Sequence, residues 1–186
     1  SVFGLIGSNG AGKSAFMRIL AGILRPDAGE VTIDGQPVWE NPAVKARCFF
    51  IPDELYFFKN ATLRTMEDYY RTVYPRFDSA RFRKLREAFS LSDKQKIQTF
   101  SKGMKQRLQI ARGLINDPSY LFLDEPTIGL DAVVSRQLRE HIRYLAGEKG
   151  KGILLTSHYM GEMEELCDMI YVMQEGRIIH KGTALQ

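Results

Sequence analysis

The chain has 186 residues, of which 44% are hydrophobic and 26% charged, and its formal net charge is +4. These values are typical of one globular domain with a sizeable core. The positive charge suits an anionic ligand, but it is too small to indicate nucleic acid by itself. No apolar run approaches the roughly 20 residues that span a bilayer.

Strands and helices are predicted to alternate in the first part of the chain. The apolar run Val2–Ile6 indicates a buried strand, and because the chain opens inside this run we expect the start of the domain to be missing. A helix is predicted over Lys13–Ile23, with an apolar face made of Phe16, Ile19, Leu20 and Ile23. The elements that follow are a hairpin over residues 29–38, turning at Asp34-Gly35, and a strand over residues 47–52.

A long, polar, helical segment over residues 62–115 interrupts this alternation. Within it Phe82, Leu85 and Phe89 share one helical face, and the neighbouring cations fall largely outside it. The later elements are a strand at 119–124, a helix at 132–146, a strand at 152–157, a helix at 160–166 and a hairpin at 168–182. The pattern predicts an α/β fold with a mostly parallel sheet, built from residues 1–61 and 116–186, and 62–115 as an inserted α-helical subdomain.

The two cysteines, Cys48 and Cys167, do not form a metal-binding spacing such as CxxC. We expect them to be reduced, packed thiols of a cytosolic protein.

A phosphate-binding motif follows the first strand, since GSNGAGKS fits the pattern G-x-x-x-x-G-K-[ST]. Glycines let backbone N–H groups turn towards phosphate oxygens, and the next helix adds the favourable dipole of its N-terminus. Lys13 is expected to reach the β- and γ-phosphates, and the Ser14 hydroxyl to bind Mg²⁺. A plain glycine turn is disfavoured, because the motif lies between a strand and a helix as phosphate binding requires. The predicted nucleotide-binding residues are Gly7, Ser8, Asn9, Gly10, Ala11, Gly12, Lys13 and Ser14.

Two carboxylates end the apolar strand in YLFLDEP. Asp124 would lie at the strand tip, where P-loop NTPases hold Mg²⁺. Glu125 would then be placed to accept a proton from the attacking water. Buried strands often end in Asp at a turn, so the pattern gains its meaning only in combination with the phosphate loop.

His158 ends the strand in ILLTSH. A lone histidine is usually structural. A histidine at the carboxyl end of a parallel strand, however, points at the ligand crevice. We therefore expect His158 to contact the γ-phosphate.

A basic stretch, FSKGMKQRLQIARGL at Phe100–Leu114, leaves three interpretations open. It could bind nucleic acid, form a solvated helix face or sense a phosphate. No aromatic residues are interleaved with its cations for bases to stack on, so nucleic acid is disfavoured.

The order of GSNGAGKS, SKGMKQR, YLFLDEPTIGLD and LLTSH resembles the nucleotide-binding domain of ATP-binding cassette (ABC) proteins. The resemblance covers nearly the whole chain, and the motifs are specific in combination. SKGMKQ occupies the place of the family's signature, usually LSGGQ, and looks most like the variant in bacterial multidrug, antibiotic and peptide exporters. The resemblance implies a P-loop NTPase fold that uses ATP and Mg²⁺, with an antiparallel β portion truncated here at the N-terminus.

In this family two domains stack head to tail, and the signature of one closes over the γ-phosphate held by the other. The resemblance therefore assigns Ser101 and Gly103 to the partner's ATP, which agrees with anion binding at a helix N-terminus. Lys102 and Lys105 replace the usual Gly and Gln, and either add positive charge near the triphosphate or face solvent. The implied signature set is Ser101, Lys102, Gly103, Met104 and Lys105, and Asp131 of the following GLD loop is assigned to the dimer contact.

The family usually has a Gln after the strand that follows the phosphate loop, where it contacts Mg²⁺ and the attacking water. The nearest match here, FFIPDELYFF, places Asp53 at that position. A carboxylate about 4 Å from a phosphate charge costs about 4 kcal/mol at an effective dielectric of about 20. An ordinary hydrogen bond returns only about 1 kcal/mol. We therefore expect Asp53 either to bind Mg²⁺ or to turn away from the nucleotide.

Aromatic residues follow Asp53 and continue into the helical segment: Tyr56, Phe57, Phe58, Tyr69, Tyr70 and Tyr74. By resemblance this lobe receives a coupling helix from a membrane permease. The alternative is that these residues form the core of the lobe, and the sequence leaves both interpretations open.

The resulting hypothesis is in-line hydrolysis of ATP, with Glu125 as the base, in a subunit of a membrane exporter on the cytoplasmic face of the plasma membrane. Its expected partners are a transmembrane permease and a second, identical or different, nucleotide-binding domain, with no nucleic acid. The alternative is an ABC ATPase that acts in translation or DNA repair. A short helical segment without heptads and a single cassette disfavour it. A P-loop kinase or GTPase would explain neither SKGMKQ nor the histidine.

Overall fold

The computed structural model describes residues 1–74, 77–88 and 90–183. The chain forms two compact units, one of Ser1–Asp53 with Pro118–Gln186 and one of Glu54–Asp117. None of the described helices combines the length and the apolar character needed to cross a lipid bilayer.

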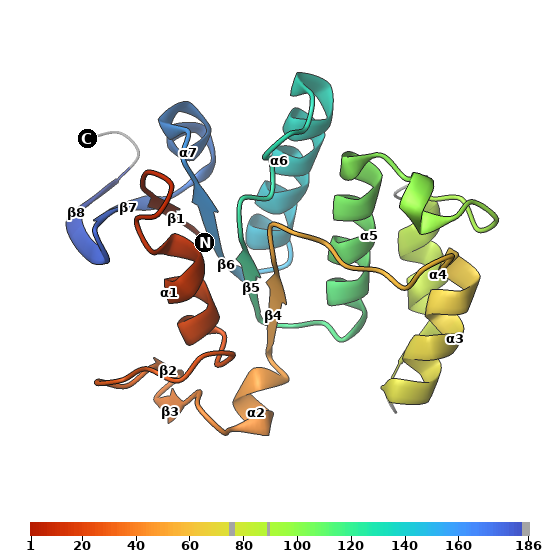
Figure 1. Ribbon diagram of the computed structural model, residues 1–186, viewed down its shortest axis with the longest axis horizontal. Coiled ribbons are helices and arrows are strands. Elements are labelled where there is room, and N and C mark those ends of the chain that lie inside the picture. The colour runs from red at the N-terminus through yellow and green to blue at the C-terminus, as the bar shows by residue number, and fades with distance from the viewer. Residues whose placement is uncertain (75–76, 89, 184–186) are drawn as a thin grey trace. The chain divides into compact units, whose positions relative to one another are not determined.

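Within the described part of the first unit, six strands form one sheet in the order β4-β5-β6-β1-β7-β8 (Figure 1). Neighbouring strands are parallel, except that β7 and β8 form an antiparallel hairpin. The predicted α/β architecture with a mostly parallel sheet is therefore confirmed. The strands are β1 (Val2–Ile6), β4 (Cys48–Ile51), β5 (Tyr120–Leu123), β6 (Gly152–Ser157), β7 (Met169–Gln174) and β8 (Arg177–Thr183).

The order of the parallel strands gathers the predicted site at one edge of the sheet, because their carboxyl ends all meet there. The phosphate loop follows the central strand β1, and His158 directly follows its neighbour β6. Asp124 follows β5, the next strand along, and Asp53 lies two residues beyond β4 at the edge.

Helices cover both faces of this sheet. On one face, Met17 and Ala21 at the end of α1 pack against Phe122 of β5. On the other face α7 approaches β1 so closely that a Cβ on Gly4 would lie 2.7 Å from the Cys167 sulfur. Besides the six-stranded sheet, the described part of the first unit contains α1 (Lys13–Leu20), β2 (Thr32–Ile33), β3 (Gln36–Pro37), α2 (Pro42–Lys45), α6 (Ala132–Gly147) and α7 (Met160–Leu166).

Helix α1 is shorter than the sequence pattern predicts. It ends at Leu20, and Gly22 adopts a left-handed conformation with φ of 69°. The N–H groups of Gly22 and Ile23 then bond to the carbonyls of Ile19 and Arg18 and close the helix end. The prediction that Ile23 extends the apolar face of this helix is therefore wrong, since the helix ends before it and the residue is 52% exposed.

Both cysteines are free thiols, as predicted, with Cys48 partly buried and Cys167 buried. Burial raises the pKa of Cys48, and it raises the pKa of Cys167 to about 12. Both groups therefore stay protonated and unreactive at neutral pH.

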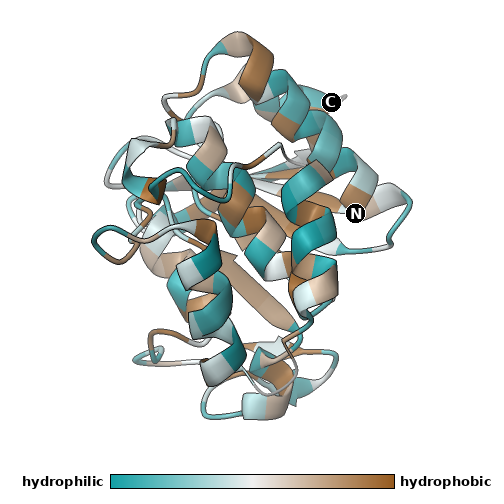
Figure 2. Cartoon of the chain, turned by 90° about the vertical axis from the view of Figure 1, so that its right-hand side faces the viewer, coloured by the Kyte–Doolittle hydropathy of each residue, from teal (hydrophilic) through white to brown (hydrophobic). Residues whose placement is uncertain are grey.

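The second unit is helical, and its helices pack around an aromatic core. Tyr70 and Phe82 are both buried, and their rings meet edge to face with centroids 6.3 Å apart. Ala61 joins the same core and its carbonyl accepts from the Ile97 N–H, so the unit begins before residue 62. Phe89, predicted on the face of Phe82, lies outside the described residues. The helices are α3 (Leu63–Val73), α4 (Ser79–Ala88), the 3-10 turn Ile97–Thr99 and α5 (Lys102–Ile115). Figure 2 shows apolar and polar residues mixed along the helices that face the viewer.

Candidate functional site

The phosphate loop has the backbone that its glycines permit. Gly10 and Gly12 adopt φ angles of 82° and 100°, a region that other residues rarely enter. A Cβ on Gly7 would overlap the backbone carbonyl of Met173. The loop closes through the Ala11 N–H, which donates to the Ser8 carbonyl at 3.1 Å. A side chain at Gly7 would therefore clash with backbone, and one at Gly10 or Gly12 would strain the loop, with or without a bound ligand.

Lys13 begins α1 and its ammonium group is enclosed by the loop that precedes it. The side chain is only 6% exposed, and Nζ donates to the carbonyls of Gly7 at 2.7 Å and Ser8 at 3.0 Å. Its nearest carboxylate is Glu125, with Nζ to Oε1 at 3.8 Å. A buried ammonium needs such partners, and the loop therefore holds a positive charge where a phosphate would bind.

A hydrogen-bonded chain orders the acidic end of β5. The buried Thr156 hydroxyl of β6 donates to Asp124 Oδ1 at 2.6 Å, and it accepts the Glu125 N–H at 2.8 Å. Asp124 is fully buried, and its second oxygen, Oδ2, has no hydrogen-bond partner in the described part of the chain.

This unpaired carboxylate oxygen fits a metal ligand, because buried acceptors are otherwise satisfied by protein or water. Among the described residues, no three His, Cys, Asp or Glu side chains cluster closely enough to hold a metal by themselves. That is consistent with Mg²⁺, which usually takes one or two carboxylates and completes its shell with water and substrate phosphates. Asp124 and the Ser14 hydroxyl are the residues that would supply the protein oxygens.

Glu125 and His158 face each other across neighbouring segments of the sheet edge. The His158 Nδ1 atom lies 3.2 Å from Glu125 Oε2, and the histidine side chain is 52% exposed. Glu125 has a φ of 46°, an uncommon left-handed conformation for a residue other than glycine, asparagine or aspartate. The structure thus brings together Lys13, Asp124, Glu125 and His158 from three different strand ends.

Several predicted residues have local structural roles that the sequence does not reveal. Ser101 is the N-cap of α5, where its hydroxyl accepts the Met104 N–H at 3.2 Å. Asp131 is the N-cap of α6 and accepts the Val134 N–H at 2.9 Å. Asp53 is partly buried and follows β4, beside the strand that carries Asp124.

The remaining signature residues, Lys102, Gly103, Met104 and Lys105, form the first turn of α5. They belong to the second unit, as does Ser101, so they are described apart from the phosphate loop. Gly103 is buried, whereas Lys102 is exposed. No acidic residue lies in this first turn, so the N-terminus of the helix keeps its favourable potential for an anion.

Thr156 is a residue that the motif analysis missed. Its hydroxyl joins Asp124 to the backbone of Glu125, although 32 residues separate it from Asp124. The available signal was a polar residue in the otherwise apolar strand that ends in LLTSH. That signal indicates a buried polar group in need of a partner, but it does not identify the partner.

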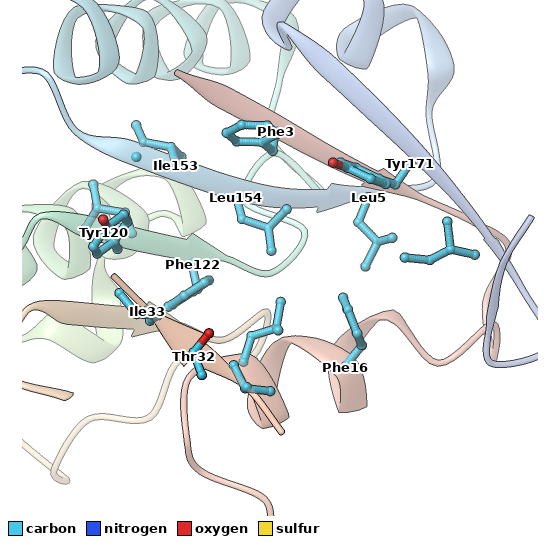
Figure 3. Close-up of a pocket in the computed structure, with 15 residues that line it drawn as sticks. Phe3, Leu5, Phe16, Thr32, Ile33, Tyr120, Phe122, Ile153, Leu154 and Tyr171 are labelled. Carbon is cyan, nitrogen blue, oxygen red and sulfur yellow. The ribbon is translucent and has the colours of Figure 1, made fainter. Parts of the chain in front are cut away.

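A separate apolar cavity of about 350 Å³ lies on the α1 face of the sheet (Figure 3). Phe3, Tyr171, Phe16 and Ile33 line it from β1, β7, α1 and β2. None of the predicted site residues contributes to its lining. It is therefore distinct from the charged group at the carboxyl edge of the sheet.

Comparison with known proteins identifies the family. The family model described as ABC transporter matches residues 1–128. The chain belongs to the ABC transporter family. The family predicted from the motifs is thereby confirmed, with its P-loop arrangement of sheet and helices.

Individual relatives agree with this family. The chain is 37% identical to the ABC transporter ATP-binding protein NatA of Bacillus subtilis (strain 168), over 98% of this chain and 76% of that protein. It is also 37% identical to the Nod factor export ATP-binding protein I of Rhizobium sp. (strain N33), over 97% of this chain and 61% of that protein. A solved ATP-binding subunit of an ABC transporter superposes with a TM-score of 0.83 at 30% identity, covering 98% of this chain and 78% of that one. The chain spans only 52% to 61% of the length of three curated relatives that it matches, the Nod factor export protein among them.

Proposed function

We propose that the chain is the ATP-binding and ATP-hydrolysing domain of an ABC membrane transporter of the export type. The observation that carries the proposal is the meeting of four groups at one sheet edge: the enclosed Lys13 ammonium, the half-satisfied Asp124 carboxylate, Glu125 and His158. A phosphate-binding loop followed by these groups suits in-line attack of water on a γ-phosphate.

Each residue has a distinct part in that reaction. Glu125 accepts a proton from the attacking water through its carboxylate. Lys13 holds negative charge on the transferring phosphate, and its pairing with Glu125 at 3.8 Å is exchanged for that contact when ATP enters. Asp124 and Ser14 would hold Mg²⁺, which would supply further positive charge beside the phosphates when bound. His158 orients Glu125 through Nδ1 and contacts the γ-phosphate.

The signature at the start of α5 supports a second role, towards ATP held by another copy of the domain. Its serine hydroxyl accepts a bond from its own helix and still has a proton to donate to a phosphate. We propose that ATP joins two such domains through Ser101 and Gly103, with Asp131 near the contact, and that hydrolysis releases them. The second domain is identical or a related chain.

A permease is the proposed membrane partner, and it would place the domain on the cytoplasmic face of the membrane. The aromatic residues of the second unit divide into two groups, one buried and one exposed. Tyr70 is buried in the core, whereas Tyr56 is 81% exposed, Phe58 55% and Tyr69 42%. The exposed members are available to a permease helix. The proteins named NatA and Nod factor export ATP-binding protein I support transport over a role in translation or DNA repair.

The test is purification of the full-length protein from its native membranes, in the wild-type form and as Glu125→Gln. We expect a polytopic membrane protein at fixed ratio, and an ATPase activity that falls by about 10²–10⁴-fold in the variant. MgATP should still bind to Glu125→Gln and hold it as a dimer. Co-purification with ribosomes or DNA would contradict the transport role, and rapid hydrolysis by the variant would contradict the role of Glu125.

A further inference from the structure

A network of charged and polar side chains lies next to the proposed catalytic pair. Glu162 is on the first turn of α7, four residues after His158. Its Oε2 accepts the Thr127 hydroxyl at 2.7 Å, and its Oε1 accepts Arg139 Nη1 at 3.1 Å. The Glu162 and Arg139 side chains are only 19% and 18% exposed. The carboxylate is thus fixed from two sides, by a hydroxyl and by a guanidinium.

This network joins the same two segments that meet at the catalytic pair. Glu125 and Thr127 lie on one segment, on either side of Pro126, while His158 and Glu162 lie on the other. The first link is Glu125 Oε2 to His158 Nδ1 at 3.2 Å, and the second is Thr127 to Glu162 at 2.7 Å. Two links between two short segments fix the distance between those segments. Because the proline ring restricts φ at Pro126, the position of Thr127 also restrains the position of Glu125.

The bond between Thr127 and Glu162 matters because the backbone of Glu125 has an unfavourable conformation that its surroundings must hold. Its left-handed φ of 46° belongs to a sparsely populated region, and such conformations persist only where surrounding bonds over-determine them. Within the turn, the Ile128 N–H donates to the Glu125 carbonyl at 3.2 Å and the Leu130 N–H to the Thr127 carbonyl at 3.1 Å. The Thr127–Glu162 bond ties this turn to α7 from outside.

We infer that Glu162 is a positioning residue that holds Glu125 in its hydrolytic geometry through Thr127, with Arg139 fixing the Glu162 carboxylate. The inference rests on the proposed ATP hydrolysis and extends it. A displacement of about 1 Å at a catalytic group costs about 100-fold in rate. A link two residues from the base is therefore placed to control turnover without touching ATP.

The chain offers a matched control. Glu165 lies on the same helix and also faces Arg139, with Oε2 3.6 Å from Nε, but its side chain is 64% exposed. Within the described part of the chain, Glu165 makes no hydrogen bond to the turn that carries Thr127. Glu165→Ala therefore removes the same charge from the same arginine and leaves the link intact.

The test compares Thr127→Val, Glu162→Ala, Thr127→Ser and Glu165→Ala in the full-length protein. We expect kcat for ATP to fall at least about tenfold in the first two variants, with the KM for ATP almost unchanged. Thr127→Ser keeps the hydroxyl and should restore kcat, and Glu165→Ala should resemble the wild type. Thr127→Val is nearly isosteric, so it keeps the test valid if Glu162→Ala folds poorly.

Amide hydrogen exchange gives a readout that does not require ATP. Exchange at Ile128 and Leu130 should accelerate in Thr127→Val and Glu162→Ala, but not in Glu165→Ala. Unchanged kcat and exchange in the first two variants would overturn the inference, as would an equal loss of kcat in Glu165→Ala. A wild-type protein without ATPase activity would instead overturn the proposed function, and exchange would then decide whether the link holds the turn.

Discussion

The two units bury different kinds of side chain. Among the described residues, the buried charged side chains Lys13, Asp124, Glu125 and Lys151 all belong to the first unit, whereas the buried polar ones of the second are Gln106 and Gln109. The second unit instead fills its interior with rings, among them Tyr70, Phe77 and Phe82. Among the described residues, the first unit therefore encloses charged as well as apolar side chains, whereas the second encloses no charged side chain.

The charged interior of the first unit shows that groups suited to binding a ligand are not the groups that stabilise the fold most. A buried charge costs free energy unless it is paired, and Asp124 keeps one oxygen without a partner in the described chain. The Lys13 ammonium group donates hydrogen bonds to the carbonyls of its own loop. Asp124 and Lys13 thus keep charge available for a ligand, whereas Tyr70 and Phe82 contribute mainly to stability.

Phe82→Ala should have the largest effect on stability. Removing this fully buried ring is expected to destabilise the second unit by about 3–5 kcal/mol, seen as faster hydrogen exchange throughout α3 and α5. The exposed Tyr56→Ala is the control, with a loss below about 1 kcal/mol. If Phe82→Ala also abolished MgATP binding by the first unit, the assignment of stability and ligand binding to separate units would be contradicted.

Thr156→Val should destabilise the first unit by about 1–3 kcal/mol, because Asp124 Oδ1 and the Glu125 N–H both lose their buried partner. Urea unfolding measures the change. Thr183→Val, at an exposed position of β8, serves as the control and should leave the free energy of unfolding almost unchanged. Equal stability of the two variants would show that the Thr156 hydroxyl contributes nothing.

Asp53→Asn tests whether the carboxylate that follows β4 contributes to the proposed Mg²⁺ site. If Asp53 contributes to the Mg²⁺ shell, the variant should need more Mg²⁺ for half-maximal ATPase activity, because a neutral amide oxygen is a weaker ligand than a carboxylate. The measurement is an Mg²⁺ titration at saturating ATP. An unchanged titration would remove Asp53 from the metal shell.

A smaller, pH-dependent effect is expected at His141 in α6. Burial disfavours the charged imidazolium and lowers the pKa of His141 below its usual 6.5. The unfolded chain then binds the proton more readily, so stability is complete above about pH 6.5 and declines as the pH falls below it. His141→Leu should flatten this dependence in urea unfolding. The same change at the exposed His180 should leave it intact, and a persistent slope in His141→Leu would refute the assignment.

Local patterns in the sequence were sufficient to predict much of this molecule. The glycine spacing of residues 7–14 predicts the loop, and the apolar runs predict the sheet with its carboxylates at one edge. The helix over Met160–Leu166 and the closing hairpin were predicted within a residue or two of their observed ends. The exception was the end of α1, where a single left-handed glycine at position 22 outweighed the apolar period.

By itself, then, the sequence determined the family and the alternation of strands and helices, and it predicted candidate residues for the site, because each depends on neighbours a few positions apart. The tertiary structure alone decided how those residues are held. The bonds of Thr156 to Asp124, His158 to Glu125 and Thr127 to Glu162 span 32, 33 and 35 residues. Such pairs form only once the strands take their places in the sheet, since the order β5-β6-β1 decides which strand ends become neighbours.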